Sequence, residues 1–468
     1  MSHYKPYSSY EDSGTEWLGK LPAHWDVKPL KWLGTYQNSN VDKKSYAGQT
    51  EVRLCNYTDV YYNERITDSL DFMVATASDS EIESMTLRKG DIVITKDSED
   101  PTDIGIPAIV AEDLENVVCG YHLTVIRVPE QYQRFVHRVI QADPTKARFY
   151  VESPGITRYG LNQDAIGGLP VVLPPPEEAG RLADFIDSEI TRIDALVEKK
   201  TRFIELLGEK RRAVMTHAVT KGLDPNVPMK DSGAEWLGEV PEHWIVQALS
   251  RVIISRCDGP FGSAIKSETY SESGVRIVRL QNIGFNEFKG EDVVYIPEDY
   301  KKSEIGVGHD VLPGDLLMAG LGDDKNILGR VCVAPENLGE TIVKADCYRF
   351  RVNSQKVTPT FLASQLSATA KIECGFISTG STRARLNLSL AAFRVVAIPP
   401  TLAEQDDIAN WVEQSTSAIN RLIKKCERSI ELLTERRSAL ITAAVTGQID
   451  LRDATVVAAS LIELRKTA

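Results

Sequence analysis

The chain has 468 residues, of which 42% are hydrophobic and 26% are charged, as in ordinary globular proteins. At roughly 150 residues per domain, this length corresponds to about three domains. The formal net charge of -12 argues against a protein that coats nucleic acid through bulk electrostatics, although local basic patches are compatible with DNA reading. No apolar run reaches the length of about 18 residues that predicts a membrane span, and the N-terminus lacks the apolar core of a signal peptide.

Seven cysteines are scattered along the chain without a C-x-x-C pair. This spacing favours neither a disulfide framework nor a structural zinc site, and it is typical of proteins in a reducing compartment. We therefore expect a soluble cytoplasmic protein that does not associate with a membrane.

The sequence contains an internal duplication. Residues 12–25 read DSGTEWLGKLPAHW and residues 231–244 read DSGAEWLGEVPEHW. Further matches follow in the same order: Gly90-Asp91 with Gly314-Asp315, Arg127-Val128 with Arg351-Val352, and GITRYGLN at 155–162 with GSTRARLN at 380–387. Two copies of this length indicate two halves of one design rather than a solenoid, which needs more and shorter repeats. We expect a pair of binding surfaces related by an internal two-fold pseudo-repeat.

Each half divides again at a proline-rich segment. Short apolar runs such as GDIVIT at 90–95 alternate with turn clusters, which predicts a mixed α/β domain with short strands. Prolines then mark an extended hinge, and the Pro-free charged and aliphatic stretch after it predicts a long helix. The expected segments are an opening repeat segment at 1–25, a mixed domain at 26–166, a hinge at 167–177 and a long helix at 178–221, then an opening repeat segment at 222–244, a mixed domain at 245–395, a hinge at 396–401, a long helix at 402–446 and a C-terminal tail at 447–468.

Both Pro-free stretches carry apolar residues at alternating steps of four and three, which is the heptad pattern of paired helices. A helix of about 40 residues is about 60 Å long, so its apolar stripe would lie in water unless the two helices cover each other. We therefore expect an α+β fold in which two long antiparallel helices form a coiled coil that separates the two mixed domains. The alternative is that each helix packs on its own domain. The predicted interface residues are Ile186, Ile193, Val197, Ile204, Leu207, Val412, Ile419, Ile423, Ile430 and Leu433.

Two arginines interrupt this apolar stripe at matching places. Arg211 and Arg437 both fall near helix ends, and we expect each either to be neutralised there or to face a partner.

The sequence contains no recognisable catalytic motif. No G-x-x-x-x-G-K-[ST] phosphate loop is present. Asp292, Asp299 and Lys301 weakly match the carboxylate–lysine group of metal nucleases, but a chain with this many charges contains such a match by chance. His24 and His243 are repeated, each before a tryptophan, and we expect them to be packed in turns. We therefore expect no catalytic and no metal-binding residues.

Four features occur in the same order in both halves. They are the DSG-x-EWLG-x-x-P-x-HW segment, the Gly-Asp pair before an apolar strand, the G-x-TR-x-x-LN motif, and a proline pair followed by a long helix. In this combination the chain resembles the specificity subunits of type I restriction–modification systems over nearly its whole length. One departure is Glu178-Ala179, where the second half has Glu404-Gln405, the form more usual after the proline hinge.

The resemblance implies a non-catalytic, sequence-specific DNA-binding subunit. The two mixed domains would be target-recognition domains that each read one half of a split, asymmetric DNA sequence, and the paired helices would set the non-specific gap. The implied partners are double-stranded DNA, two modification (methyltransferase) subunits and restriction (motor–nuclease) subunits. S-adenosylmethionine, ATP and Mg are implied in those partner subunits, and no cofactor in this chain. The implied location is the cytoplasm of a prokaryote.

Two alternatives belong to other classes of protein. A single-chain fused restriction endonuclease would cleave DNA by itself with a divalent metal. A coiled-coil assembly adaptor would not bind DNA.

The candidate DNA-contacting residues fall into two groups. Residues shared by both halves would serve the scaffold or the phosphates, because two domains that read different sequences need different base contacts. The shared residues are Arg53 and Arg279, Asn56 and Asn282, and Arg158 and Arg383. Base-reading candidates lie in unlike polar loops, since Arg and Lys bond guanine and Asn bonds adenine. They are Asn38, Asn40, Lys43, Lys44, Lys96 and Tyr159 in the first half, and Ser263, Lys266, Lys325, Asn326 and Arg385 in the second.

Overall fold

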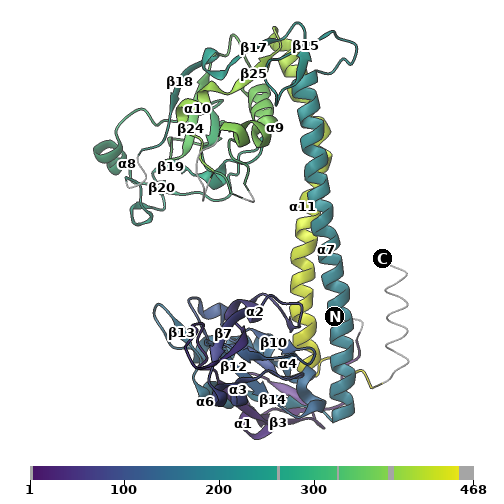
Figure 1. Ribbon diagram of the computed structural model, residues 1–468. Coiled ribbons are helices and arrows are strands. Elements are labelled where there is room, and N and C mark those ends of the chain that lie inside the picture. The colour runs from purple at the N-terminus through teal and green to yellow at the C-terminus, as the bar shows by residue number, and fades with distance from the viewer. Residues whose placement is uncertain (1–3, 261–263, 324–325, 378–383, 453–468) are drawn as a thin grey trace. The chain divides into compact units, whose positions relative to one another are not determined.

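The computed structural model describes residues 4–260, 264–323, 326–377 and 384–452 (Figure 1). The chain forms two compact units: unit 1 contains Met1–Lys200 and Arg428–Ala468, and unit 2 contains Thr201–Glu427. Each unit therefore contains one mixed α/β domain and a part of each of two long helices. None of the helices within the described ranges is both long enough and apolar enough to cross a membrane.

Unit 1 contains two main sheets and several short helices. Its strands are β1 (Tyr10–Asp12), β2 (Lys20–Pro22), β3 (Asp26–Pro29), β4 (Thr35–Asn38), β5 (Thr50–Cys55), β6 (Arg65–Ile66), β7 (Met73–Ala77), β8 (Ile92–Thr95), β9 (Asp97–Ser98), β10 (Pro107–Val110), β11 (Val117–Cys119), β12 (Leu123–Arg127), β13 (Tyr159–Gly160) and β14 (Pro170–Leu173). Its short helices are α1 (Leu30–Leu33), α2 (Tyr57–Tyr61), α3 (Asp79–Met85), η1 (Pro101–Asp103), η2 (Glu130–Tyr132), α4 (Gln133–Gln141), α5 (Asp143–Glu152) and α6 (Gln163–Gly167). One sheet has the order β4-β12-β8-β10-β6 and the other β11-β5-β7, with three two-stranded ladders β1-β2, β3-β14 and β9-β13.

The five-stranded sheet of unit 1 is buried on both faces. Along β8, Ile92 and Ile94 pack into one apolar cluster with Val136 of α4, whereas Val93 packs into another with Val52 of β5. A strand buried on both faces has apolar residues at every position rather than at alternate ones. This explains why the predicted strand GDIVIT is continuously apolar.

Unit 2 has the same kind of architecture. Its strands are β15 (Met229–Asp231), β16 (Glu239–Pro241), β17 (Ile245–Ala248), β18 (Ile253–Cys257), β19 (Val275–Val278), β20 (Tyr295–Ile296), β21 (Leu316–Ala319), β22 (Val331–Val333), β23 (Thr341–Val343), β24 (Cys347–Val352) and β25 (Val395–Ile398). Its helices are η3 (Leu249–Arg251), η4 (Ser267–Thr269), η5 (Leu280–Asn282), α8 (Glu298–Tyr300), the π-helix η6 (Lys301–Ile305), α9 (Pro359–Ile377) and α10 (Leu388–Phe393). The sheets are β18-β24-β21-β22 and β20-β19-β23, with the ladders β15-β16 and β17-β25. Here too the residues of β21 alternate between two apolar clusters, with Leu316 and Met318 in one and Leu317 and Ala319 in the other.

The repeated Gly-Asp and Arg-Val pairs form the same buried ion pair in both units. Asp91 is 4% exposed and accepts hydrogen bonds from Arg127, with a distance of 3.0 Å from Arg127 Nη2 to Asp91 Oδ2. In unit 2, Arg351 Nη2 donates to Asp315 Oδ2 at 2.8 Å. Gly90 has a φ of +88° and its counterpart Gly314 a φ of +83°, a conformation that glycine adopts without strain. The repeated Gly-Asp and Arg-Val pairs therefore stabilise the scaffold that the two units share.

The repeated His-Trp pair is explained by a glutamate far away in the sequence. Glu178 is 4% exposed, and its carboxylate accepts hydrogen bonds from Trp25 Nε1 at 3.1 Å and from the Tyr7 hydroxyl at 2.5 Å. His24 Nε2 lies 2.9 Å from Glu178 Oε2. The same arrangement recurs in unit 2 with Glu404, His243 and Trp244. Both histidines lie in turns, as expected, but their side chains are 37% and 43% exposed rather than packed. Through the glutamate, each connects the opening segment to the start of a long helix.

The two long helices are α7 (Pro176–Lys221) and α11 (Leu402–Val445). Pro176 begins α7 because proline lacks only an N–H group that would have no partner in the first turn of a helix. The prolines before the helices do not form free hinges throughout. Pro170–Leu173 and Val395–Ile398 are strands, because they pair with β3 and β17 in antiparallel ladders.

Within each unit, segments of α7 and α11 pack side by side in opposite directions. In unit 1, Ile186 and Ile190 belong to one apolar cluster with Leu440 and Ala444. In unit 2, Met215 packs into one cluster with Val412. Of the predicted interface residues, Ile186, Ile193, Leu207, Val412 and Ile419 are buried, and Val197, Ile204, Ile423, Ile430 and Leu433 are half-buried. The leucines off the heptad stripe at 196, 206, 422 and 432 are exposed by 39–49%.

An ionic network connects the mixed domain of unit 1 to both long helices. Glu64 forms ion pairs with Arg138 of α4 and with Arg437 of α11. Arg138 Nη2 also lies 2.5 Å from Asp187 Oδ1 of α7. Burial alone would raise the pKa of Glu64 and of Asp187, but the neighbouring arginines outweigh it and hold both pKa values below their ordinary range.

This network predicts that unit 1 loses stability in acid. A carboxyl group with a depressed pKa stabilises the folded state above its unfolded pKa of about 4.3, and this contribution disappears as the pH falls through the folded pKa. His137 acts in the same direction, because burial lowers its pKa to about 4, while the unfolded chain binds that proton below about 6.5. We expect the free energy of unfolding to fall between pH 7 and pH 4.

Urea unfolding at several pH values checks this prediction. The variant Glu64→Gln should show a smaller loss of stability below about pH 5 than the natural chain. The matched control is Glu99→Gln, which changes an exposed residue of the same domain. Equal pH dependence in Glu64→Gln and in the natural chain would contradict the role of the network.

Candidate nucleic-acid interface

Each mixed domain carries a strained turn before one of its central strands. His122 directly precedes β12 and Asp346 directly precedes β24, and their φ values are +75° and +64°. The left-handed region costs a residue with a side chain roughly 1–2 kcal/mol, and such residues cluster at functional sites. The two turns occupy matching places in the repeat and hold unlike residues. They are therefore candidates for a function that differs between the two halves.

In unit 1 the turn belongs to a group of polar and aromatic residues that we call the His122 cluster. It consists of Lys96, Asp97, Tyr121, His122 and Arg158. Asp97 Oδ2 lies 2.8 Å from His122 Nδ1, and Asp97 Oδ1 accepts a hydrogen bond of 2.8 Å from Arg158 Nη2. The ammonium of Lys96 lies 5.0 Å from the centre of the Tyr121 ring. A carboxylate thus holds one arginine, and an aromatic face holds one lysine.

The arginine of the His122 cluster is accessible, whereas Lys96 is half-buried. The side chain of Arg158 is 57% exposed, whereas the Asp97 side chain that orients it is 17% exposed. Tyr121 is 50% exposed. A guanidinium that is oriented at one nitrogen and open to solvent is suited to two parallel hydrogen bonds with a guanine edge or a phosphate.

In unit 2 the matching group is the Asp346 cluster, which consists of Tyr270, Arg279, Lys344, Asp346 and Arg385. Arg385 Nη2 donates to Asp346 Oδ1 at 2.8 Å, and the Arg385 side chain is 59% exposed. Lys344 Nζ donates to the Tyr270 hydroxyl at 2.8 Å. The guanidinium of Arg279 lies 5.9 Å from the centre of the same ring. The elements of the first cluster recur: a carboxylate-held arginine and a lysine on an aromatic ring.

The structure brings several predicted DNA-contacting residues of the first half together. Lys96 and Arg158 belong to the His122 cluster, and Tyr159 lies beside it because β13 pairs with β9. The loop that contains Asn40, Lys43 and Lys44 is adjacent, since Tyr121 N donates to Val41 O at 2.7 Å. Asn38 ends β4 just before this loop, and its Oδ1 accepts a hydrogen bond of 2.6 Å from Thr124 Oγ1. Two shared residues lie elsewhere: Arg53 pairs with Asp68 at 2.6 Å, and Asn56 caps α2.

In the second half, Arg279 and Arg385 belong to the Asp346 cluster. Lys266 is exposed just before η4, and Asn326 donates to Asp323 Oδ1 in an exposed loop. Three predicted residues, Ser263, Lys325 and Arg383, lie outside the described residues.

Asn282 requires a correction. It is 1% exposed, and its side-chain amide donates to the carbonyl oxygens of Lys289 and Asp292. The prediction that Asn282 contacts DNA is wrong, because its side chain braces its own loop.

Sequence reasoning missed Tyr121 and His122 in the first half, and Tyr270, Lys344 and Asp346 in the second. A signal was nevertheless present. The matched Arg-Val pairs at the ends of β12 and β24 place these two strands in register, and His122 and Asp346 then fall at the same position. They are unlike polar residues at one place in the repeat, which is the pattern expected of base-reading residues.

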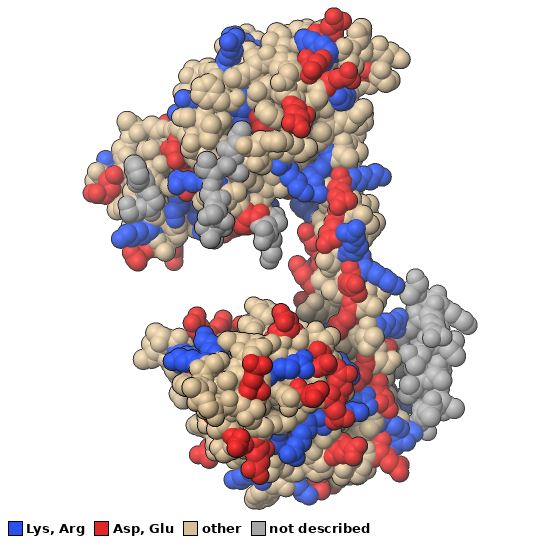
Figure 2. All heavy atoms as spheres, viewed as in Figure 1, with Lys and Arg blue, Asp and Glu red and all other residues tan. Residues whose placement is uncertain are grey.

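The charges around these clusters are mixed. On the face drawn in Figure 2, acidic and basic side chains are interspersed over the described residues of each unit. Within the described ranges, no group of three or more His, Cys, Asp or Glu residues is placed to hold a metal ion. Of the weak nuclease match, Asp292 is paired with Arg279, and Lys301 is paired with Glu340.

Several known proteins that match this chain come from type I restriction–modification systems, although no family model matches it. It is 25% identical over 288 residues to the type I restriction enzyme MjaVIII specificity subunit of Methanocaldococcus jannaschii, covering 60% of this chain and 63% of that relative. It is 23% identical over 455 residues to the putative type I restriction enzyme MjaX specificity subunit of the same organism, covering 93% of this chain and 96% of that one. A chain solved in work on complex assembly and conformational transition of the type I R-M system matches with a TM-score of 0.64 at 15% identity, covering 92% of this chain and 99% of that chain, so the two share a fold.

Proposed function

Because the chain belongs to the family of type I restriction enzyme specificity subunits, we propose that it is the non-catalytic, DNA-reading subunit of such a complex. Each mixed domain reads one half of a split, asymmetric sequence in double-stranded DNA. Two modification subunits bind S-adenosylmethionine and transfer its methyl group, and restriction subunits cleave the DNA in a reaction that uses ATP and Mg. The proposal rests on one observation: the two units place unlike polar clusters at the same point of a shared scaffold.

The chemistry of the clusters suits base reading. Arg158 and Arg385 are each held by a carboxylate and open to solvent, and an arginine in this position pairs with guanine O6 and N7. For Arg158 this revises the scaffold or phosphate role expected of a residue that both halves share. Lys96 and Lys344 each lie against a tyrosine, where they can reach phosphate or guanine without losing their orientation. The shared Asp91–Arg127 and Asp315–Arg351 ion pairs hold strands β12 and β24, which follow the two turns. The two domains therefore use one framework to read two different half-sites.

The long helices then act as a spacer between the two reading domains. Helices of 46 and 44 residues are about 69 Å and about 66 Å long. The heptad residues of both are buried or half-buried while leucines beside the stripe are exposed, which supports an antiparallel coiled coil. The length of this coiled coil sets the gap between the half-sites.

The carboxylate-held arginines give a prediction with a base-level readout. Arg158→Ala should weaken binding to the natural target by about 1–3 kcal/mol, or roughly five- to 150-fold, and relax discrimination at one base pair of one half-site. Arg385→Ala should do the same in the other half-site. The measurement is binding of the reconstituted complex to duplexes in which each target base pair is replaced in turn.

The control for this series is Lys89→Ala, which removes an exposed cation from the same domain as Arg158 but lies outside the cluster. It should leave base preference unchanged. Equal weakening on all duplexes would assign Arg158 to a phosphate contact, and an unchanged binding profile would remove it from the interface.

Hydroxyl-radical footprinting of the reconstituted complex tests the proposed function. The proposal expects two protected tracts on one duplex, separated by an unprotected or weakly protected gap. Cleavage of DNA by the purified chain with Mg would favour a fused endonuclease. A complex that assembles without protecting DNA would favour an assembly adaptor.

A further inference from the structure

The two arginines on the heptad stripes have different partners. In unit 1, Arg437 of α11 forms an ion pair with Glu64, and its Nε lies 3.3 Å from Asp194 Oδ1 of α7. At the matching place in unit 2, Arg211 of α7 meets Asn420 of α11, and Arg211 Nη1 donates to Asn420 Oδ1 at 2.7 Å. Asp194 and Asn420 are separated in the sequence by the same number of residues as Arg211 and Arg437, so they occupy matching positions in the repeat. The second copy therefore has an amide where the first has a carboxylate.

Arg211 is also left with an unused donor. Its Nε is buried, and no hydrogen-bond acceptor lies within reach of it in the part of the chain that the structure describes. Burial lowers the pKa of Arg211, so its charge is not fully compensated by its surroundings. A buried N–H without an acceptor costs about 1–3 kcal/mol. An acceptor that reached this nitrogen would recover that free energy.

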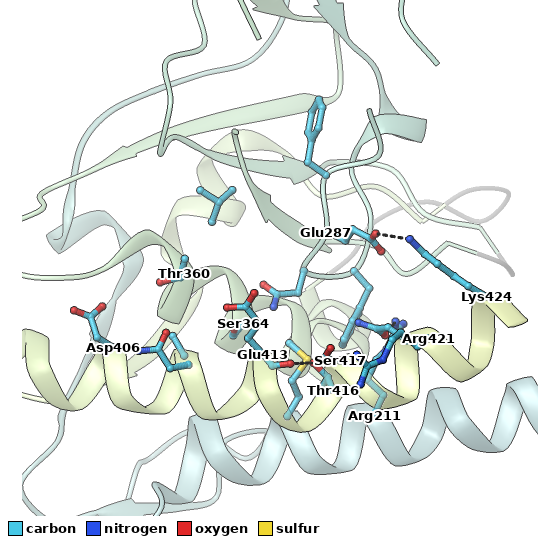
Figure 3. Close-up of a pocket in the computed structure, with 18 residues that line it drawn as sticks. Arg211, Glu287, Thr360, Ser364, Asp406, Glu413, Thr416, Ser417, Arg421 and Lys424 are labelled. Atoms are coloured by element: carbon cyan, nitrogen blue, oxygen red, sulfur yellow. Dashed lines mark hydrogen bonds and ion pairs between the residues drawn. The ribbon is translucent and has the colours of Figure 1, made fainter. Parts of the chain in front are cut away.

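Arg211 lines a pocket of about 510 Å³ in unit 2 (Figure 3). The pocket lies between α7, α11, α9 and the loop that follows η5. Ser364 of α9 lines it at the place that matches Arg138 in unit 1. The loop carries Glu287, but this carboxylate pairs with Lys424 at 3.8 Å rather than with Arg211. The corresponding place in unit 1 is a smaller pocket of about 280 Å³, in which the lining residues Glu64 and Arg437 pair with each other.

The charges around the pocket indicate what can enter it. Figure 3 shows Arg211 and Arg421 close together, with the carboxylate of Glu413 farther along α11. Asp406 and Glu287 also line the pocket. A DNA backbone would bring several phosphates against these three carboxylates, which repel it. A protein segment with one acidic side chain among neutral or basic ones fits these charges. Its acidic side chain can pair with the arginines, and its neutral or basic neighbours are not repelled by the carboxylates.

We propose that this pocket binds an acidic side chain of a partner protein, whose carboxylate takes the place at Arg211 that Glu64 and Asp194 hold at Arg437. Because Arg211 Nε is closed to solvent, the side chain must shift for the carboxylate to accept hydrogen bonds from Nε and Nη2, as two charge-assisted bonds on one planar group. The site goes beyond DNA reading, because its occupant is a protein and its residues lie outside the Asp346 cluster.

The first experiment measures the site on the full chain. The ¹⁵Nε–¹H signal of Arg211 is followed by NMR during titration with N-acetylglutamate α-amide, a mimic of a glutamate side chain, at constant ionic strength. A saturable shift of this signal is expected. Asn420→Asp places a carboxylate beside Arg211 as in unit 1, so binding should weaken about tenfold or more.

The matched control is Asp194→Asn, which makes the opposite exchange in unit 1 and should leave the Arg211 titration unchanged. Thermal unfolding establishes that both variants are folded. The absence of a saturable Arg211 shift, or equal affinity in Asn420→Asp and the natural chain, would overturn the site.

The second experiment identifies the source of the carboxylate. A photo-cross-linking residue replaces Ser417, which lines the pocket, in cells that carry the complete system. The proposal expects a cross-linked protein peptide that contains Asp or Glu, with a lower yield when Asn420→Asp is added. Cross-links to DNA alone would overturn the protein occupant, and so would a response to the free carboxylate without any protein cross-link.

Discussion

Replacing residues 26–166 with the matching domain of a relative that has another target should change one half of the recognised DNA sequence and leave the other half unchanged. The physical reason is that the mixed domain of unit 1 has its own apolar clusters and its own polar cluster at His122. Specific binding exceeds non-specific binding by a factor of about 10³ or more. Discrimination at the exchanged half-site should therefore shift by a comparable factor.

The exchange is measured by binding of the reconstituted complex to four duplexes that combine the old and new half-sites. Grafts should keep Glu64 and Arg138, because these residues hold the domain on α7 and α11. The matched control exchanges residues 245–395 and should alter only the other half-site. A change in both half-sites after one exchange would contradict independent reading.

Insertion of four residues after Glu198 of α7 should lengthen the tolerated gap in the DNA target by one or two base pairs. Four helical residues add about 6 Å, and the base-pair rise along a duplex is about 3.4 Å. On the original target the two domains can no longer engage together. Loss of simultaneous binding should weaken the complex by about 10²-fold or more.

Binding of this variant is compared on duplexes whose gap differs by single base pairs. A control chain carries the same four residues in the exposed turn at 225–226, after the end of α7. The control should keep the natural gap. An unchanged optimum after insertion at Glu198 would contradict the spacer.

Much of the scaffold follows from the sequence because its determinants are local or repeated. The heptad stripes predict both long helices to within a few residues, since every turn of a helix repeats the signal. The repeated Gly-Asp and Arg-Val pairs mark the same ion pair in each half, because Asp91 and Arg127 occur at matching positions as Asp315 and Arg351. Repetition supplied the comparison that a single sequence otherwise lacks.

The candidate interface could be predicted only in part. Lys96 and Arg385 were predicted as base-reading residues and Arg158 as a shared residue for the scaffold or the phosphates, but their carboxylate and aromatic partners come from segments far away in the sequence. Similarly, nothing near His24 in the sequence indicates that Glu178 will hold it. Contacts across long sequence separations depend on strand order, which local patterns do not encode.

The strands in the predicted hinges show the same limit. Pro170–Leu173 is locally typical of extended chain, and only its pairing with β3 makes it a strand. The Arg211 pocket needed the structure as well. The sequence shows that Arg211 and Arg437 match, but not that Glu64 pairs with Arg437 while Arg211 meets Asn420 and pairs with no carboxylate of the described residues.

The central claim is that one polypeptide carries two separate reading domains for one DNA target. Sequencing of methylated bases in a host that expresses the complete system tests it most directly. The account predicts a single asymmetric motif made of two specified tracts on either side of an unspecified gap of fixed length. A continuous motif, or two identical tracts in a palindrome, would contradict it.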